Sequence, residues 1–198
     1  MRMTYLPRSG YQRVPWKNGL GVTEEIAKQL DPATQQFIWR LSIATVAEDG
    51  PFSLFTGYQR IISVLAGKGM VLTVNGLVSE AITEFHPFTF DGAANTECRL
   101  VDGGIFDFNV IYDPQLVSAT LIWQTIAPEK TLELAANHTH FILVGKGDVK
   151  LQTALTNQAL STWDAVKIDA EQQSLVLQLS THSSAIVAVV SLAMKVAE

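Results

Sequence analysis

Hydrophobic and polar residues alternate along most of this chain, in short stretches that end at turn residues. In one such stretch Leu41 and Ile43 alternate with Arg40 and Ser42. A period of two places successive side chains on opposite faces of a β-strand. Comparable stretches are residues 61–65, 70–74, 85–90, 98–101 and 106–112, followed by 120–126, 139–144, 149–153, 175–179 and 185–190.

Turn residues between these stretches indicate how the strands connect. The Asn75-Gly76 pair is a strong hairpin signal because both residues tolerate a positive φ. Residues 25–30 and 152–160 are the segments compatible with brief helices. Many short strands with regular turns are typical of an antiparallel sandwich or barrel. We therefore predict an all-β protein.

The strand pattern also repeats within the chain. Gly67-Lys68-Gly69 recurs as Gly145-Lys146-Gly147, 78 positions later. The same ungapped offset lays 64–66 over 142–144, 88–91 over 166–169, and 108–110 over 186–188. This self-similarity predicts two copies of one β module. We expect two tandem antiparallel barrel halves, 1–112 with a ligand pocket and 113–198 as a degenerate copy.

Composition narrows the class of protein. With 198 residues, 47% hydrophobic and 17% charged, the chain suits one globular unit or two small packed halves. No run approaches the roughly 20 apolar residues of a membrane helix, and Met1–Pro15 lacks the apolar core of a secretory signal. The single Cys98 excludes an intrachain disulfide. We expect a cytoplasmic protein that is not bound to a membrane.

Charge argues against a nucleic-acid partner. The formal net charge is −5, and lysine and arginine occur singly along the chain. Binding to phosphate backbones requires a clustered basic face. The sequence offers none.

The densest polar segment runs from Trp16 to Ile26 and includes Asn18 at a turn. On the strand that follows, Thr23 and Glu25 share one face. On the strand of residues 39–44, Arg40 and Ser42 share a face in the same way. These side chains either line an interior pocket, or Glu25 and Arg40 form a partly buried structural ion pair.

Two further groups of polar residues complete the candidate binding site. Ser53 and Arg60 flank a turn, and arginine presents a planar fork that suits a carboxylate ligand. Asp107 and Asn109, again at a spacing of two, supply an acceptor and a mixed donor and acceptor. The alternatives are that Arg60 is a solvated strand residue and that the other two make strand-end hydrogen bonds.

These polar residues fall into four motifs in a fixed order. They read Asn18-Gly19-x-Gly21-x-Thr23-x-Glu25, Trp39-Arg40-x-Ser42-x-Ala44, Gly50-Pro51-Phe52-Ser53-x-Phe55-x-Gly57-x-x-Arg60 and Asp107-x-Asn109. In this order and spacing the first half resembles the HutD/Ves family, and the second half resembles it in general pattern only. Leu20 departs from the family, which usually has a third consecutive glycine there.

The resemblance implies a pair of cupin-type barrels and a link to histidine utilisation or stress response. It also suggests a regulatory binder of a small anionic metabolite, such as a formylated glutamate-like intermediate. Many cupins hold a metal through an H-x-H pair, a later histidine and a glutamate seven residues before the turn glycine. Here Arg60 occupies the glutamate position, and a cation there repels a divalent ion. We expect no metal in the first half.

The second half leaves the metal question open. His138 and His140 lie two residues apart, and His182 follows late in the chain. Imidazoles at this spacing can share a metal ion, but no carboxylate falls at the expected place. The alternative is a pair of histidines at a strand start near solvent, and we expect no cofactor.

Three functions are compatible with these residues. The first is a non-catalytic protein that binds a small carboxylate, as a monomer or a homodimer. The second is a metal-independent isomerase or lyase with Glu25 or His86 as general base. The third is a structural or partner-binding protein whose polar set only fastens the barrel.

Overall fold

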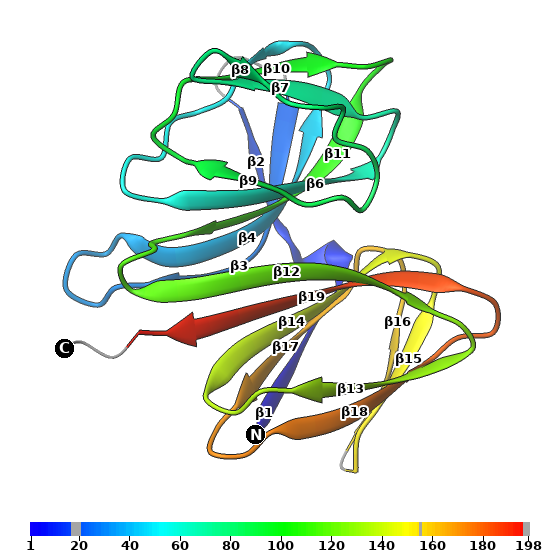
Figure 1. Ribbon diagram of the computed structural model, residues 1–198. Coiled ribbons are helices and arrows are strands. Elements are labelled where there is room, and N and C mark those ends of the chain that lie inside the picture. Colours follow the sequence, from blue (N-terminus) through cyan, green and yellow to red (C-terminus); the bar gives the residue numbers. More distant parts are fainter. Residues whose placement is uncertain (17–20, 155, 196–198) are drawn as a thin grey trace. The chain divides into compact units, whose positions relative to one another are not determined.

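The computed structural model describes residues 1–16, 21–154 and 156–195, and the described part is built almost entirely of strands (Figure 1). The first half contains β1 (Arg2–Leu6), the 3-10 turn η1 (Arg8–Gly10), β2 (Gln12–Pro15), β3 (Gly21–Leu30), β4 (Phe37–Val46), β5 (Gly50–Pro51), β6 (Gln59–Ala66), β7 (Met70–Val74), β8 (Leu77–Val78), β9 (Phe88–Asp91), β10 (Thr96–Leu100) and β11 (Ile105–Tyr112). The second half contains β12 (Val117–Ile126), β13 (Glu129–Leu134), β14 (His138–Lys146), β15 (Val149–Gln152), β16 (Asn157–Leu160), β17 (Ala165–Ala170), β18 (Leu175–Ser180) and β19 (Ala185–Met194).

The chain divides into two compact units. The first unit is Gln12–Val117, and the second unit combines Met1–Tyr11 with Ser118–Glu198. Strand β1 pairs with β17 from Arg2↔Asp169 to Leu6↔Ala165. The first eleven residues thus belong with the second half of the chain, and not with the unit of residues 1–112 expected from the sequence.

Both units have the same strand order. In the first unit the sheets run β2-β3-β4-β11-β6-β9 and β5-β10-β7-β8; in the second they run β1-β17-β14-β19-β12 and β13-β18-β15-β16. When β1, β2 and β3 are set aside, β4 to β11 and β12 to β19 form the same two four-stranded sheets. This is the order of a jelly roll, which two Greek keys generate. The internal repeat is therefore visible in the topology.

The constant offset of 78 residues is wrong in detail. Phe108 pairs with Ser63 between β11 and β6. An ungapped offset would pair Ile186 with Phe141, but Phe141 pairs with Val190. Each of these ladders contains a bulge at an equivalent place, next to Asp107↔Val64 in one and Val144↔Val187 in the other. Counted from the bulge, the two ladders correspond at an offset of 80 residues (187 − 107 and 144 − 64). The shift is even, so it leaves the same face of each strand toward the core.

Neither segment compatible with a helix is helical in the residues that the structure describes. Residues 25–30 lie in β3, which pairs with β4 along its length, and β16 occupies the end of 152–160. Local propensity is a weak determinant when a neighbouring strand satisfies the backbone hydrogen bonds. Among the described residues, no helix has the length and apolar character needed to cross a membrane.

The hydrophobic core of each unit lies between its two sheets. In the first unit Ile62 and Val64 of β6 pack with Met70 and Leu72 of β7, and Cys98 of β10 joins the same cluster. In the second unit the core combines residues of β12, β14, β17 and β19 with residues of β13, β15, β16 and β18. Alternation along the strands thus determines which side chains meet in each interior.

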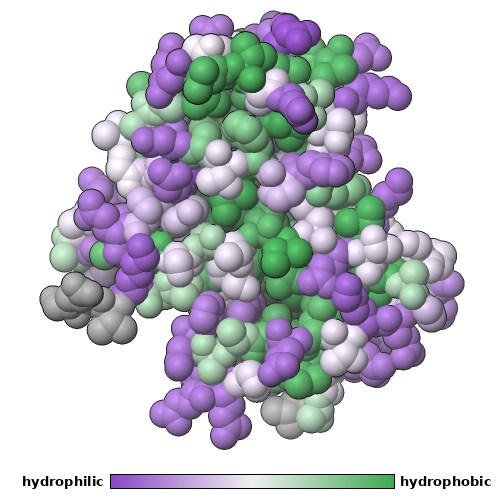
Figure 2. All heavy atoms as spheres, viewed as in Figure 1, coloured by the Kyte–Doolittle hydropathy of each residue, from purple (hydrophilic) through white to green (hydrophobic). Residues whose placement is uncertain are grey.

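One end of the first unit carries exposed apolar residues. At the β7–β8 hairpin, Leu77 and Val78 are exposed, and Figure 2 shows hydrophobic surface over this end of the unit. Hydrophilic side chains are interspersed over the rest of the face in view. Single exposed apolar residues of this kind are ordinary on protein surfaces.

Candidate functional site

The polar side chains of the site lie on one face of three neighbouring strands. On β4, Arg40 and Ser42 alternate with Trp39 and Leu41, which are both 1% exposed. Strand β11 lies between β4 and β6 and pairs Asn109 with Ser42. The same strand face continues into the core of the unit, so the polar residues occupy the inner side of the sheet.

These residues surround a cavity of about 660 Å³ within the first unit. Pockets for small ligands usually measure roughly 300–1,000 Å³. The lining is Val14, Pro15, Trp16, Thr23, Arg40, Ser42, Ala44, Pro51, Phe52, Ser53, Phe55, Arg60, Asp107, Asn109 and Ile111. The cavity therefore combines apolar walls with two arginines and a carboxyl group.

Arg60 is the most enclosed cation of the cavity. It is 6% exposed, and its Nη2 donates a hydrogen bond of 2.7 Å to Oδ1 of Asn109. Its guanidinium carbon lies 5.0 Å from the ring centroid of Phe52, 5.4 Å from that of Phe55 and 4.9 Å from that of Phe90. Burial lowers the pKa of Arg60 to about 10, against the opposing effect of Asp107. Arg60 is thus a cation near neutral pH.

Arg40 lies nearer the solvent on strand β4, which β11 separates from the strand of Arg60. Its guanidinium carbon is 5.2 Å from the ring centroids of both Phe37 and Phe55. Phe55 consequently contacts both arginines. Burial lowers the pKa of Arg40, and the charge of Glu25 partly offsets this effect.

Asp107 supplies the negative charge inside the cavity. It is 1% exposed and accepts a hydrogen bond from the Nδ2 group of Asn109. The amide of Asn109 therefore links the carboxyl of Asp107 to the guanidinium of Arg60. Burial raises the pKa of Asp107 to about 7, although Arg60 and the hydrogen bond from Asn109 both act to lower it.

Two buried donors of the arginines lack partners. The Nε groups of Arg40 and Arg60 make no hydrogen bond to any described residue. A buried donor without a partner costs about 1–3 kcal/mol. The two positive charges of Arg40 and Arg60 also exceed the single negative charge that Asp107 can carry, so the described lining has a surplus positive charge. An anion with oxygen acceptors would satisfy both conditions.

Most of the residues expected from the sequence line this cavity. They are Thr23, Arg40, Ser42, Ser53, Arg60, Asp107 and Asn109. The hydroxyl oxygen of Thr23 accepts a hydrogen bond of 2.8 Å from Nε1 of Trp16. Asn18 and the neighbouring Leu20 lie outside the described residues.

Glu25 does not belong to the lining. Its carboxylate forms a 3.0 Å ion pair with Nζ of Lys28. The ladder of β3 on β4 shifts between Glu25 and Ala27, and this bulge brings Lys28 opposite Arg40 and onto the face of Glu25. The structure thus gives Glu25 a lysine partner, a pairing that strict alternation along β3 does not allow.

The apolar walls of the cavity are not predicted by the sequence pattern. Trp16, Phe52, Phe55 and Ile111 line the cavity, and none of them is among the binding residues expected from the sequence. The spacing of Phe52 and Phe55 around Ser53 was visible in the sequence. Nothing in it indicated that the same rings would contact the guanidinium groups.

The described residues of the second unit form no equivalent of this charged cavity face. Counting from the bulge in each ladder, Val187 corresponds to Asp107, Val189 to Asn109 and His140 to Arg60. Val187 is fully buried in the core of the second unit. At the positions of Asp107 and Asn109 the second unit therefore has valines that pack in its core, and at the position of Arg60 it has a buried histidine.

The two histidines of β14 are engaged in other contacts. His140 is 1% exposed, with Nδ1 2.8 Å from Oγ of Ser191 and Nε2 2.9 Å from the carbonyl oxygen of Ala135. The ring of His138 stacks on it at a centroid distance of 5.5 Å. His182 lies exposed in the turn before β19. In the described parts of the chain, no three His, Cys, Asp or Glu side chains are grouped to hold a metal ion.

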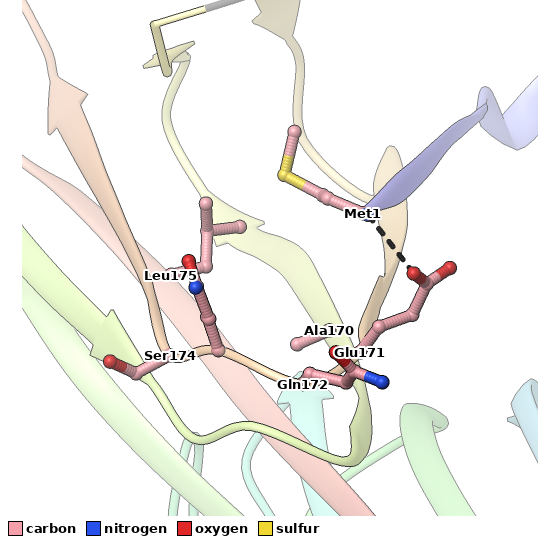
Figure 3. A pocket seen from close by; sticks show the side chains of 7 residues that line it. Met1, Ala170, Glu171, Gln172, Ser174 and Leu175 are labelled. Atoms are coloured by element: carbon pink, nitrogen blue, oxygen red, sulfur yellow. Dashed lines mark ion pairs between the residues drawn. The ribbon is translucent and has the colours of Figure 1, made fainter.

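A smaller cavity of about 290 Å³ lies in the second unit (Figure 3). It is formed by Met1 and the turn of residues 170–175. The terminal amino group of Met1 is 3.8 Å from the carboxylate of Glu171, which is largely exposed. This lining has no buried charge, so it is a weaker candidate than the cavity of the first unit.

Comparisons with known proteins give a consistent relationship. A family model described as HutD matches residues 8–187. A Pseudomonas putida protein, described as an uncharacterized 21.2 kDa protein in the hutC 3' region, is 37% identical over 185 residues, covering 90% of this chain and 93% of that protein. Protein Ves of Citrobacter koseri is 38% identical over 97 residues, covering 48% of this chain and 50% of Ves.

Solved structures show the same relationship and the class of fold. HutD from Pseudomonas fluorescens SBW25 has a TM-score of 0.85 and 33% identity, covering 98% of this chain and 100% of that chain. A cupin 2 conserved barrel domain protein from Leptotrichia buccalis has a TM-score of 0.57 and 10% identity, covering 88% of this chain and 89% of that chain. The second similarity concerns the fold alone, which is cupin-like.

Proposed function

The chain belongs to the HutD family, and from this premise we propose that it binds a small carboxylate in the cavity of the first unit without transforming it. The observation that carries the proposal is the pair of buried Nε donors of Arg40 and Arg60 that lack partners. A carboxylate accepts hydrogen bonds from a guanidinium fork with matching geometry. It would also offset the surplus positive charge.

The shape of the cavity supports a ligand with an apolar body and an anionic end. Trp16, Phe52, Phe55 and Ile111 provide apolar walls, while the arginines lie on β4 and β6, the two strands on either side of β11. Each hydrogen bond between the charged groups would contribute about 1.5–3 kcal/mol. Ser42, Ser53 and Thr23 add hydroxyl groups for polar substituents.

We place this binding in the regulation of amino-acid catabolism. A relative lies in a hutC 3' region, and a formylated glutamate-like metabolite would present the carboxylates that the arginines favour. HutD from Pseudomonas fluorescens was solved in a formate condition, and formate is the smallest carboxylate.

We further propose that the protein is a bicupin of two jelly-roll barrels. It is cytoplasmic and acts as a monomer or a homodimer, without nucleic-acid or membrane partners. A role in stress response is part of the same proposal.

One observation favours a metal-independent enzyme as the second candidate. Asp107 lines the cavity with a pKa of about 7, which suits a general acid or base at neutral pH. It replaces Glu25 and His86 as the candidate base, because neither of these lines the cavity. Turnover of a bound carboxylate, followed by NMR, would distinguish this candidate from simple binding.

The binding proposal is tested by calorimetry and thermal shift. A panel of amino-acid catabolites, including formylated and imidazole-derived carboxylates, should contain a ligand that raises the melting temperature. Arg40→Gln and Arg60→Gln should each weaken its binding roughly tenfold or more, the loss of at least one charge-assisted hydrogen bond.

The matched control is Arg99→Gln, which removes an exposed arginine of β10 in the same unit. It should bind the ligand as the unchanged protein does. Equal losses in all three variants would show that only the net charge matters. Unaltered binding in both cavity variants would reject the proposed site.

A further inference from the structure

Asp107 is placed where its charge and that of a bound anion must interact. It lines the same cavity as Arg40 and Arg60 and is connected to Arg60 through the amide of Asn109. Because the carboxyl is 1% exposed, water screens little of its interaction with a neighbouring charge. Any anion held by the arginines therefore adds a second negative charge near a carboxyl that water hardly reaches.

The surroundings of Asp107 contain few other groups that could take part. Its direct neighbours on β4 and β6 are the uncharged Ala44 and Val64. Arg60 of β6 acts on Asp107 directly, while Arg40 of β4 acts on Arg60. On the opposite sheet, burial raises the pKa of the Cys98 thiol of β10 to about 12. The charges of Asp107 and Asp49 raise it in the same direction.

From this arrangement we infer that Asp107 determines the ligand charge that the cavity accepts: a dianion when its carboxyl carries a proton, and a monoanion when it is ionised. The inference rests on the proposed function, since it concerns the same cavity. Asp107 is then a specificity-determining residue, because its carboxylate repels a ligand more strongly the more negative charge the ligand carries. Arg40 and Arg60 provide the attraction for both kinds of ligand.

The pH range follows from the sign of the pKa change. Near neutral pH Arg60 stays protonated, because its pKa is about 10, and the buried Cys98 thiol stays neutral. Asp107, with a pKa of about 7, changes its charge in this range. Below about pH 7 two cations face a neutral acid, and above it they face a carboxylate. A bound dianion raises the pKa of Asp107 further. Above about pH 7, the binding of a dianion is therefore accompanied by the uptake of a proton by Asp107.

The experiment compares glutarate with pentanoate, which has the same chain length but one carboxylate. Both are mostly ionised at about pH 6 and fully ionised by about pH 8.5. Calorimetry should show that glutarate affinity falls roughly tenfold across this range, while pentanoate affinity falls less. In Asp107→Asn both affinities should be independent of pH, and glutarate should bind at high pH as it binds the unchanged protein at low pH.

The control is Asp102→Asn, which removes one exposed acidic charge from a turn of the same unit. It should keep the pH dependence of the unchanged protein. If glutarate binds with equal affinity at both ends of the range, or if Asp107→Asn keeps the pH dependence, the inference is overturned while the proposed function stands. If neither ligand nor any catabolite of the panel binds at any pH, the proposed function fails and the inference falls with it.

Should Asp107→Asn fail to fold, the unchanged protein still decides the matter. Glutarate binding near pH 8 is then measured in HEPES and in Tris, whose heats of ionisation differ. The inference predicts an uptake of about half a proton for each glutarate bound. Equal heats in the two buffers would overturn it.

Discussion

Asp107 and the two arginines show how burial changes the chemistry of ordinary side chains. In water an aspartate is ionised at neutral pH, but the enclosed carboxyl of Asp107 has a pKa of about 7. The nearby Arg60 does not abolish this effect, because its own charge is also desolvated. The cavity thus holds a group that titrates near neutral pH without any histidine in its lining.

Asp107 should make folding depend on pH in an unusual direction. Folding raises its pKa from about 4 to about 7, so the folded state binds the proton more tightly. The resulting stability is complete below about pH 4 and is lost as pH rises to about 7. Asp107→Asn, which cannot ionise, should therefore raise the free energy of unfolding at about pH 8 by on the order of 2 kcal/mol. Urea unfolding at several pH values measures this; a destabilised variant at pH 8 would contradict it.

His140 should have the opposite effect in the second unit. Burial lowers its pKa, and the neighbouring His138 acts in the same direction. The stability that neutral His140 contributes is present above the unfolded pKa of about 6.5 and is lost as pH falls through the folded value. His140→Gln should remove part of the acid sensitivity seen by urea unfolding below about pH 6. His182→Gln, at an exposed position, should not.

At the scale of elements, the turn after β6 depends on a backbone conformation that favours glycine. Gly67 has φ +114°, and a Cβ there would lie 2.8 Å from Cγ2 of Ile105 and 3.0 Å from the carbonyl oxygen of Gly104. Ile105 begins β11, the strand that carries Asp107 and Asn109. The glycine therefore allows the β6–β7 turn to approach a strand of the cavity.

Gly67→Ala should destabilise the protein by about 2–3 kcal/mol, because strain at φ adds to the steric conflict. Two other glycines separate these causes. Gly76 has φ +83° with nothing within 4 Å of the added Cβ, so its alanine variant should lose about 1 kcal/mol. Gly50 has open space and no positive φ, so Gly50→Ala should be nearly neutral. Equal effects in thermal unfolding would refute the steric explanation.

At the scale of the whole molecule, the N-terminal segment ties the start of the chain to the second unit. Besides pairing β1 with β17, it places the Tyr5 hydroxyl 2.8 Å from Oδ2 of Asp164. The Arg8 guanidinium carbon lies 4.1 Å from the ring centroid of Trp163, and the Tyr11 hydroxyl donates to the carbonyl oxygen of the same tryptophan. The second unit is therefore completed by residues from the opposite end of the sequence.

Removal of residues 1–6 should destabilise the second unit selectively. The deletion exposes the edge of β17, so hydrogen exchange should accelerate in β17 and β14. Carboxylate binding should persist, since the cavity residues lie within Gln12–Val117. Tyr5→Phe, which removes one hydrogen bond and keeps the strand, should have a much smaller effect. Loss of binding in the deletion variant with unchanged exchange in β17 would contradict this division.

Period-two alternation by itself determined the all-β class and the inner face of β4 and β11. This information is local, since neighbouring residues of a strand point to opposite faces. It placed Arg40 with Ser42 and Asp107 with Asn109 before any strand neighbours were known. It could not recognise the bulge that gives Glu25 its lysine partner, because a bulge depends on the pairing of two strands.

Only the tertiary structure decided which strands meet and which charges are enclosed. The pairing of β1 with β17 joins residues 159 (Leu6↔Ala165) to 167 (Arg2↔Asp169) positions apart in the chain, and no local pattern specifies it. The burial of Arg60 and the titration of Asp107 arise where β6, β11 and the aromatic wall come together. A sequence shows which side chains are charged, but the pKa of each depends on how completely the fold removes water from around it.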